Sequence, residues 1–184
     1  HRPAPIFRPI SNNGYPNMIM SKKAARRLAL GLLASGMVAM PVASQAQYEQ
    51  RISNNLANCA PGKGPAIRVT ITDIKSSTGK VRLHSYYAKK SDWLKKGRWL
   101  KRIDIPAKAG TMTFCIPVDA PGEYALGARH DKNGNDEDDI TIDGAAMSND
   151  PPINIFNLGK PSVKKATFTV GSGVTNVTMR MRYL

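Results

Sequence analysis

After residue 46 the sequence has no segment in which apolar residues keep a helical spacing over three turns. That absence argues against a helical fold. The sequence also lacks a serine in a nucleophile-elbow motif and a glycine-rich phosphate loop that follows a strand. A hydrolase or a nucleotide-binding enzyme is left without a recognisable site, so we expect a protein that is not an enzyme.

Long apolar runs are scarce as well. The one that occurs, Leu28–Ala43, is short for a bilayer span. It follows the basic segment Ser21–Arg27 and precedes Ser44-Gln45-Ala46, which offers small residues where a signal peptidase cleaves. We therefore expect a signal peptide over residues 18–46 and a mature chain that begins at Gln47. An N-terminal membrane anchor is the alternative.

These boundaries predict where the protein is found and how the chain is divided. Residues 1–17, ahead of Met18 and Met20, have no periodicity and are expected to be a disordered leader. Residues 47–65 form an N-terminal segment, and residues 66–184 form the folded domain. We expect a periplasmic or secreted protein with no membrane span after signal cleavage.

Acidic residues are few: 13 stand against 27 Lys and Arg, for a formal net charge of +14. Six of the basic residues and none of the acids lie in residues 1–46, which leaves the mature chain at +8. An exported protein rarely meets nucleic acid, so we expect no nucleic-acid partner. The basic surface fits contact with envelope glycans or proteins, or a role in solubility alone.

Cysteine is limited to Cys59 and Cys115. A zinc site would need more ligands, and His84 and His130 are the only histidines in the same part of the chain. Two cysteines in an exported domain favour a disulfide. Two separate buried thiols are the alternative.

What the chain does have is alternation of period two. In AIRVTITDI, Ile67, Val69 and Ile71 alternate with polar residues, and six further segments repeat the pattern up to VTNVTMRMRYL at the end. These segments, separated by Gly, Pro and Asn turns, predict an all-β fold. We expect a single antiparallel β-sandwich of about seven strands with a Greek-key crossing, as in immunoglobulin-like sandwiches.

The scarce acids gather in one segment, DKNGNDEDD. It places oxygen-bearing side chains at alternate positions, as a calcium loop does. The candidate ligands are Asp131, Asn133, Asn135, Glu137 and Asp139. Asp136 stands where that motif uses Gly, and the Glu that ends the motif is replaced by Ile142. A metal-free loop held by Asx turns is the alternative, so the expected cofactor is either none or Ca²⁺.

The same region resembles a known family. Its signature is a Gly-x-Tyr-Ala strand that runs into His-Asp-x-Asn-x-Asn, here Gly122, Tyr124, Ala125, His130, Asp131, Asn133 and Asn135. The pattern resembles exported bacterial proteins grouped as a domain of unknown function, and the resemblance extends over about residues 59–183. It implies a secreted β-sandwich similar to transthyretin-like and carboxypeptidase-regulatory-like domains, with no established activity. Members often have Gly where this chain has Asp136, so their metal geometry does not carry over.

A second candidate site is KKSDWLKKGRWLKR, which combines seven basic residues with two tryptophans. Charge and stacking there suit carbohydrate or anionic glycan. The candidate ligand-binding residues are Trp93, Trp99, Lys95, Lys96 and Arg98. The alternative is that the tryptophans anchor this loop onto the core while the lysines stay solvated.

The two histidines of the mature chain are not expected to be catalytic. His130 and Asp131 are adjacent on a strand and point in opposite directions, so they do not form a base and its orienting carboxylate. The sequence therefore predicts a non-enzymatic binding or accessory module at the cell envelope. A glycan-binding module that uses Trp93 and Trp99 is the alternative.

Overall fold

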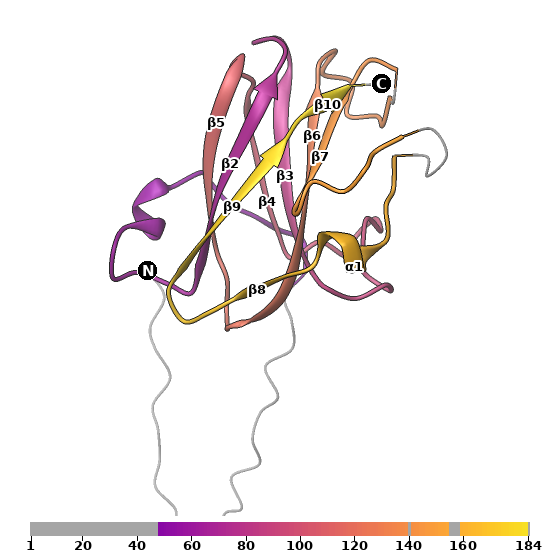
Figure 1. Cartoon of the computed structure of the whole chain (residues 1–184). Coiled ribbons are helices and arrows are strands. Elements are labelled where there is room, and N and C mark those ends of the chain that lie inside the picture. The colour runs from indigo at the N-terminus through magenta and orange to yellow at the C-terminus, as the bar shows by residue number, and fades with distance from the viewer. Residues whose placement is uncertain (1–47, 140, 155–158, 184) are drawn as a thin grey trace, which may run out of the picture. The chain divides into compact units, whose positions relative to one another are not determined.

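The computed structural model describes residues 48–139, 141–154 and 159–183 (Figure 1). The expected leader, signal peptide and cleavage site lie outside the described residues. The described part contains ten strands and two four-residue helices. In chain order these are β1 (Gln50–Arg51), η1 (Leu56–Cys59), β2 (Ala66–Ile74), β3 (Lys80–Tyr87), β4 (Lys101–Pro106), β5 (Gly110–Pro117), β6 (Gly122–Asp131), β7 (Gly144–Met147), α1 (Val163–Ala166), β8 (Phe168–Val170), β9 (Val174–Arg180) and β10 (Arg182–Tyr183).

The strands form two sheets. The larger has seven strands in the order β1–β4–β3–β6–β7–β10, with β8 also paired to β6, and the smaller has the order β5–β2–β9. The expectation of purely antiparallel sheets was wrong, because β1 pairs with β4 and β2 pairs with β9 in parallel. A parallel partner must return by a long connection, and β9 reaches β2 only after the chain has passed through the other sheet.

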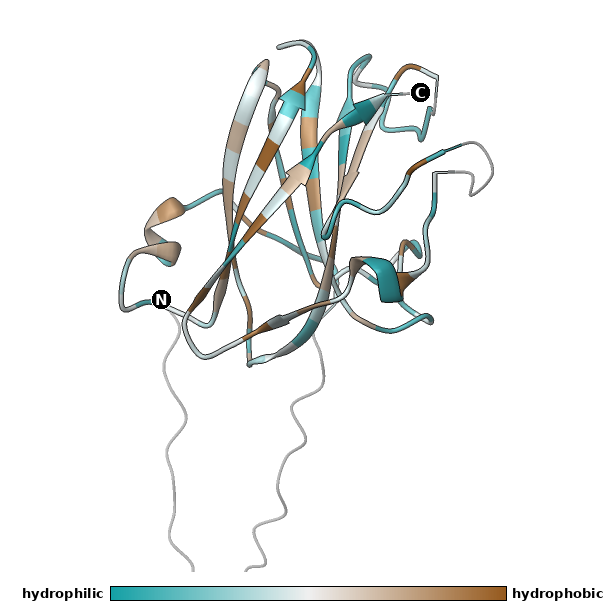
Figure 2. Cartoon of the chain, in the orientation of Figure 1, coloured by the Kyte–Doolittle hydropathy of each residue, from teal (hydrophilic) through white to brown (hydrophobic). Residues whose placement is uncertain are grey.

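A hydrophobic core lies between the sheets. Ile67, Val69 and Ile71 of β2 are fully buried in one cluster with Val81 and Leu83 of β3. The alternation that predicted these inward positions is visible along the strands (Figure 2). Full burial of such a side chain stabilises the fold by roughly 1.5–3 kcal/mol, so this cluster is the main source of cohesion between the sheets.

Two elements differ from the expected strands. β7 was not anticipated, because Gly-Ala-Ala-Met has little of the β-branched or aromatic character that marks a strand. It fits because Gly144 has no side chain: a Cβ there would lie 2.6 Å from the ring of Tyr183. In KKATFTV, residues 164–170, period-two alternation also predicts a strand, but the segment divides between α1 and the shorter β8.

Part of the outer face of the seven-stranded sheet is covered by apolar side chains. A second apolar cluster joins Tyr86, Ala125 and Met147 of the sheet to Trp93 and Trp99, which come from the loop between β3 and β4. Ile153 and Ala166 complete the cluster from the connection that leads to β8. β6 is therefore buried on both faces.

Cys59 and Cys115 form the expected disulfide, with their Cα atoms 5.9 Å apart. It ties η1 to β5, so the segment before β2 is fixed to the smaller sheet. Neither helix in the described part of the chain has the length or apolarity needed to cross a membrane.

Candidate functional site

The acidic segment forms a tight loop at the end of β6. The Asp131 carboxylate is fully buried and accepts hydrogen bonds from the backbone N–H groups of Gly134, at 2.9 Å, and Asp136, at 3.1 Å. Asp136 adopts a left-handed backbone with φ of 66°. One carboxylate therefore closes the loop by satisfying two backbone donors.

The other side-chain oxygens of the loop also serve its own backbone. Asn133 accepts from the N–H of Asn135, Asn135 accepts from that of Glu137, and Asp139 accepts from that of Thr141. These are Asx turns. Among the described residues, no group of three or more His, Cys, Asp or Glu side chains is arranged to hold a metal ion. The hydrogen bonding matches the Asx-turn interpretation of the loop.

The loop's carboxylates pair with cations on the neighbouring strands. Asp136 binds both Lys80, at 2.6 Å, and Arg82 of β3, while Asp138 binds Arg129 of β6. Hydrogen bonds from Lys80 and then Arg82 hold the pKa of the Asp136 carboxyl well below its usual value. The basic protein concentrates its acids here because this loop lies over a basic patch of the sheet.

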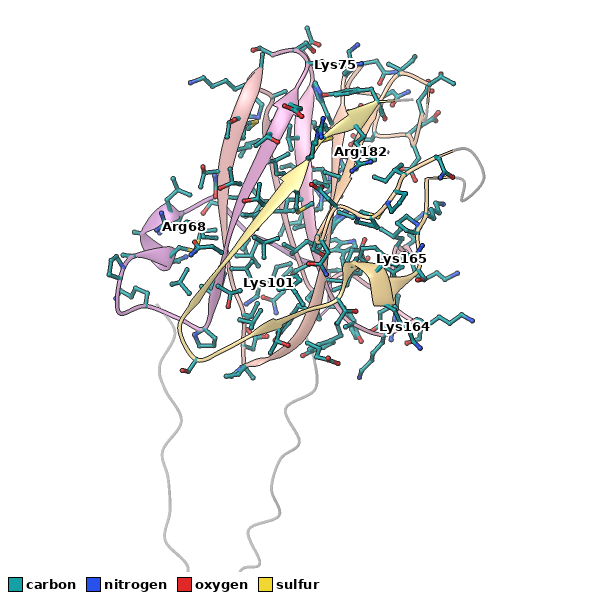
Figure 3. The ribbon with its side chains drawn as sticks, in the orientation of Figure 1. Arg68, Lys75, Lys101, Lys164, Lys165 and Arg182 are labelled. Carbon is teal, nitrogen blue, oxygen red and sulfur yellow. A yellow bond between two sulfur atoms is a disulfide. The ribbon has the colours of Figure 1, made fainter. Side chains whose placement is uncertain are left out.

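That patch is a row of side chains across five neighbouring strands. Register pairs Arg82 with Asp104 on one side and with Arg129 on the other, and Ala145 then links Arg129 to Arg182 of β10. Directly paired residues project to the same face of a sheet, so the row lies on the outer face. Figure 3 labels Arg182 at the β10 end of the row.

A cavity of about 500 Å³ lies over this row. Its size is within the usual range for sites that bind small molecules. Its lining includes Leu94 and Trp99 from the loop between β3 and β4, together with Asp136, Asp138 and Asp139 of the acidic loop. Its charged lining comprises seven cations (Arg82, Lys95, Lys96, Arg102, Arg129, Lys160 and Arg182) and four carboxylates (Asp136, Asp138, Asp139 and Asp143), an excess of positive charge.

His84 lies in this cavity between Arg82 and Arg102. Its ring stacks on Trp99 with centroids 5.3 Å apart, and its Nδ1 is 3.4 Å from the Tyr86 hydroxyl. Burial first, and then the charges of Arg102 and Arg82, lower the pKa of His84 to about 3. The ring is neutral at pH 7, and its buried Nε2 has no hydrogen-bond partner within the described part of the chain.

Arg129 is also incompletely paired. Its Nη1 binds Asp138, but the buried Nε and Nη2 have no hydrogen-bond partner in the described structure. Asp143 lies 3.9 Å from Nε and Asp131 lies 3.6 Å from Nη2, near enough for charge attraction but too far for a hydrogen bond. Buried polar atoms without a hydrogen-bond partner are rare in folded proteins and costly to the fold.

The family comparison identifies the domain that carries this cavity. Residues 69–178 match the model of a bacterial family described as "Uncharacterized protein conserved in bacteria (DUF2141)". The chain belongs to this family. The match runs from β2 into β9 and includes Arg82, His84, Arg102 and Arg129, so the cavity floor lies mainly within the DUF2141 domain. Comparisons with curated proteins and with solved structures found no match.

The residues of the candidate glycan site do not all line the cavity of this DUF2141 domain. Trp93 is 8% exposed and donates from Nε1 to the Pro161 carbonyl at 2.8 Å, so it anchors the loop. Arg98 forms an ion pair with Asp92 at 2.7 Å, and its guanidinium group lies over the ring of Tyr48. Trp99, Lys95 and Lys96 do line the cavity.

His130 holds the end of β6 in place. Its Nε2 donates to the Thr78 carbonyl at 2.8 Å, and its Nδ1 lies 2.6 Å from the Tyr183 hydroxyl. Both ring nitrogens are thereby occupied.

Sequence reasoning missed the arginines at 82, 102, 129 and 182. Their positions follow from outward registers on four strands, and alternation indicates each register. Alternation does not report the order of the strands in the sheet, and that order brings the four arginines together.

Proposed function

We propose that the protein is a non-enzymatic, exported binding module whose ligand site is the cavity on the outer face of the seven-stranded sheet. The observation that carries the proposal is the cavity floor. His84 Nε2 lies there without a hydrogen-bond partner among the described residues, in a cavity whose seven lysines and arginines outnumber its four carboxylates. An anion is the ligand that such a floor attracts.

The same contacts support a binding role over catalysis. His130 is occupied at both ring nitrogens, and His84 stacks on Trp99 with arginines on either side and the Tyr86 hydroxyl nearby. Neither arrangement pairs a nucleophile with a base.

Export is supported by the Cys59–Cys115 disulfide, because such bonds persist in oxidising compartments. Two sheets that share one core also support a relation to transthyretin-like and immunoglobulin-like sandwiches.

The alternative, a glycan platform built on Trp93 and Trp99, has less support. Sugar stacking needs an open aromatic face, whereas both rings are less than a tenth exposed. Trp99 already stacks on His84, and Trp93 packs edge-on against Tyr86 with centroids 5.4 Å apart.

The test is anion-dependent stability at fixed ionic strength. Acetate, sulfate, phosphate and succinate would be compared with chloride in thermal melts of the protein and of two variants. Arg129→Gln removes a cation from the cavity floor. Lys164→Gln removes an exposed cation from α1, outside the cavity (Figure 3).

At ten times its dissociation constant a ligand adds about 1.4 kcal/mol of stability, which raises the melting temperature by a few degrees. We expect such a rise with at least one anion in the wild type and in Lys164→Gln, and its loss in Arg129→Gln. Equal shifts in all three proteins, or no shift with any anion, would rule the site out.

A further inference from the structure

The arginine pair at the centre of the cavity floor is already occupied by a pair of carboxylates. Arg82 and Arg129 face each other across β3 and β6 in direct register. Asp136 binds Arg82 and Asp138 binds Arg129. The two aspartates belong to one loop and are separated only by Glu137.

The register explains why two negative charges are needed here. Like charges directly opposite each other on neighbouring strands destabilise a sheet. The guanidinium groups are also largely buried, with side chains 9% and 14% exposed. Each therefore requires a counter-charge. Asp104 of β4 provides one to Arg82 at 2.7 Å, and the acidic loop adds Asp136 to Arg82 and Asp138 to Arg129.

The two aspartates of the loop are themselves open to solvent. Their side chains are 60% exposed for Asp136 and 77% for Asp138, in contrast to the fully buried Asp131 that closes the loop. Because each carboxylate can return to water, these two contacts are exchangeable while the loop keeps its own hydrogen bonds through Asp131.

We propose that the cavity takes an organic diacid, whose two anionic groups replace the carboxylates of Asp136 and Asp138 on Arg82 and Arg129. The inference rests on the proposed function of the cavity and names the class of its ligand. The loop shows the required spacing, since two carboxylates on one short connection reach both guanidinium groups at once.

The rest of the cavity suits the body of such a molecule. Leu94 and Ile153 provide apolar lining. His84 adds a further polar contact: when the Tyr86 hydroxyl donates to Nδ1, the neutral ring carries its proton on the unpartnered Nε2. Guanidinium groups bind carboxylates strongly, because they donate two hydrogen bonds in one plane.

The loop then acts as an internal competitor, and this gives the proposal a sharp consequence. Removing its two carboxylates should strengthen binding of a diacid, because the site keeps all its cations and loses its competitor. Each exposed ion pair contributes little, so the expected gain for Asp136→Asn/Asp138→Asn is between about twofold and thirtyfold in affinity.

Glu137 provides the matched control. It lies between the two aspartates, is exposed, and forms no ion pair with a described residue. Glu137→Gln removes one charge from the same loop without freeing either arginine. Its affinity for a diacid should stay within about twofold of the wild type, because charges exposed to solvent are strongly screened.

The experiment is isothermal titration calorimetry with the linear diacids from succinate to pimelate, together with butyrate and inorganic phosphate as one-headed probes. We expect one diacid length to bind best and at least tenfold more tightly than butyrate or phosphate. The double aspartate variant should bind it more tightly still, and Arg82→Gln/Arg129→Gln should bind it at least tenfold more weakly. Circular dichroism of each variant establishes that it is folded.

Each other outcome has a distinct meaning. Arginine-dependent binding with phosphate or butyrate equal to the diacids would overturn the diacid class and leave an anion site standing. Unchanged or weaker binding in the double aspartate variant would overturn the competition. No binding of any probe by the wild type or the double aspartate variant would overturn the proposed function itself.

Discussion

At the scale of single residues, His84 shows how burial and neighbouring charge act together. Its ring stacks on Trp99 and lies near Arg82 and Arg102. The protonated ring would therefore be poorly solvated and repelled by both arginines. In the folded protein the pKa of His84 is lowered from 6.5 to about 3. The unfolded chain therefore binds this proton at a pH where the folded protein does not.

This difference predicts an acid dependence of stability that belongs to one residue. As pH falls from 6.5 towards 3, the free energy of unfolding should decrease by up to about 1.4 kcal/mol per pH unit. His84→Gln should have a flatter profile between pH 6.5 and 5. Urea denaturation at each pH measures both slopes.

Carboxylates account for a separate region of the same profile. Asp104 has a lowered pKa: burial opposes the shift, but hydrogen bonds from Arg102 and Arg82 outweigh it. Its contribution is present above its unfolded pKa and is lost as pH falls below that value, so it changes little above pH 5. Identical slopes for the wild type and His84→Gln above pH 5 would contradict the assignment to His84.

At the scale of elements, the turn between β2 and β3 touches the start of the acidic loop. Gly79 has a φ of +70°, and a Cβ there would lie 1.9 Å from the backbone oxygen of Asp131. Gly134, in the loop itself, has a similar φ of +72° with nothing within 4 Å of a Cβ. Comparing substitutions at the two glycines therefore distinguishes the cost of backbone strain from the cost of a steric clash.

Replacing each glycine by alanine should give different losses of stability. Gly134→Ala should lose about 1–2 kcal/mol, the cost of a left-handed residue with a side chain. Gly79→Ala should lose about 2–5 kcal/mol, because the clash with Asp131 is added. Chemical denaturation of the two variants measures the difference, and equal losses would show that the turn moves freely away from the loop.

The disulfide also acts at this scale, because it joins η1 to β5 across 56 residues of sequence. Closing a loop of that length stabilises a protein by about 4 kcal/mol in the chain-entropy account. Cys59→Ala/Cys115→Ala should therefore lose about that amount in urea denaturation, and a reductant should destabilise only the wild type. Two free thiols in the non-reduced protein, found by mass spectrometry, would contradict the bond.

At the scale of the whole molecule, the positive charge is unevenly opposed. The acids of the loop at residues 131–139 offset the arginine row, whereas Lys95, Lys96 and Lys160 at the cavity border add to its positive potential. These three lysines are exposed, so they attract anions from solvent toward the cavity. Added salt should therefore weaken anion binding.

Export is a property of the whole chain and is predicted from residues outside the described structure. Cleavage after Ala46 would leave Gln47 as the first residue of the mature protein. Mass spectrometry of protein recovered from the periplasm or the medium should find that N-terminus. Recovery of protein that retains the basic segment Ser21–Arg27 would favour the membrane anchor instead.

The sequence by itself determined which residues face the core and how the cysteines pair. Ile67, Val69 and Ile71 are buried as their alternation predicts, since a strand places every second side chain on the same face. Two cysteines in a domain expected to be exported allowed one disulfide. The expected resemblance to a bacterial family of unknown function agrees with the family model that matches residues 69–178.

Only the tertiary structure decided the strand order, the partly covered outer face and the cavity. Arg82 and Asp136 are separated by 54 residues, and nothing in the local pattern of either segment reports the other. Periodicity states which face of a strand a residue occupies, but not which strands lie beside it or what packs over that face. The pairing of Asp136 and Asp138 with arginines of the sheet could not be predicted for the same reason.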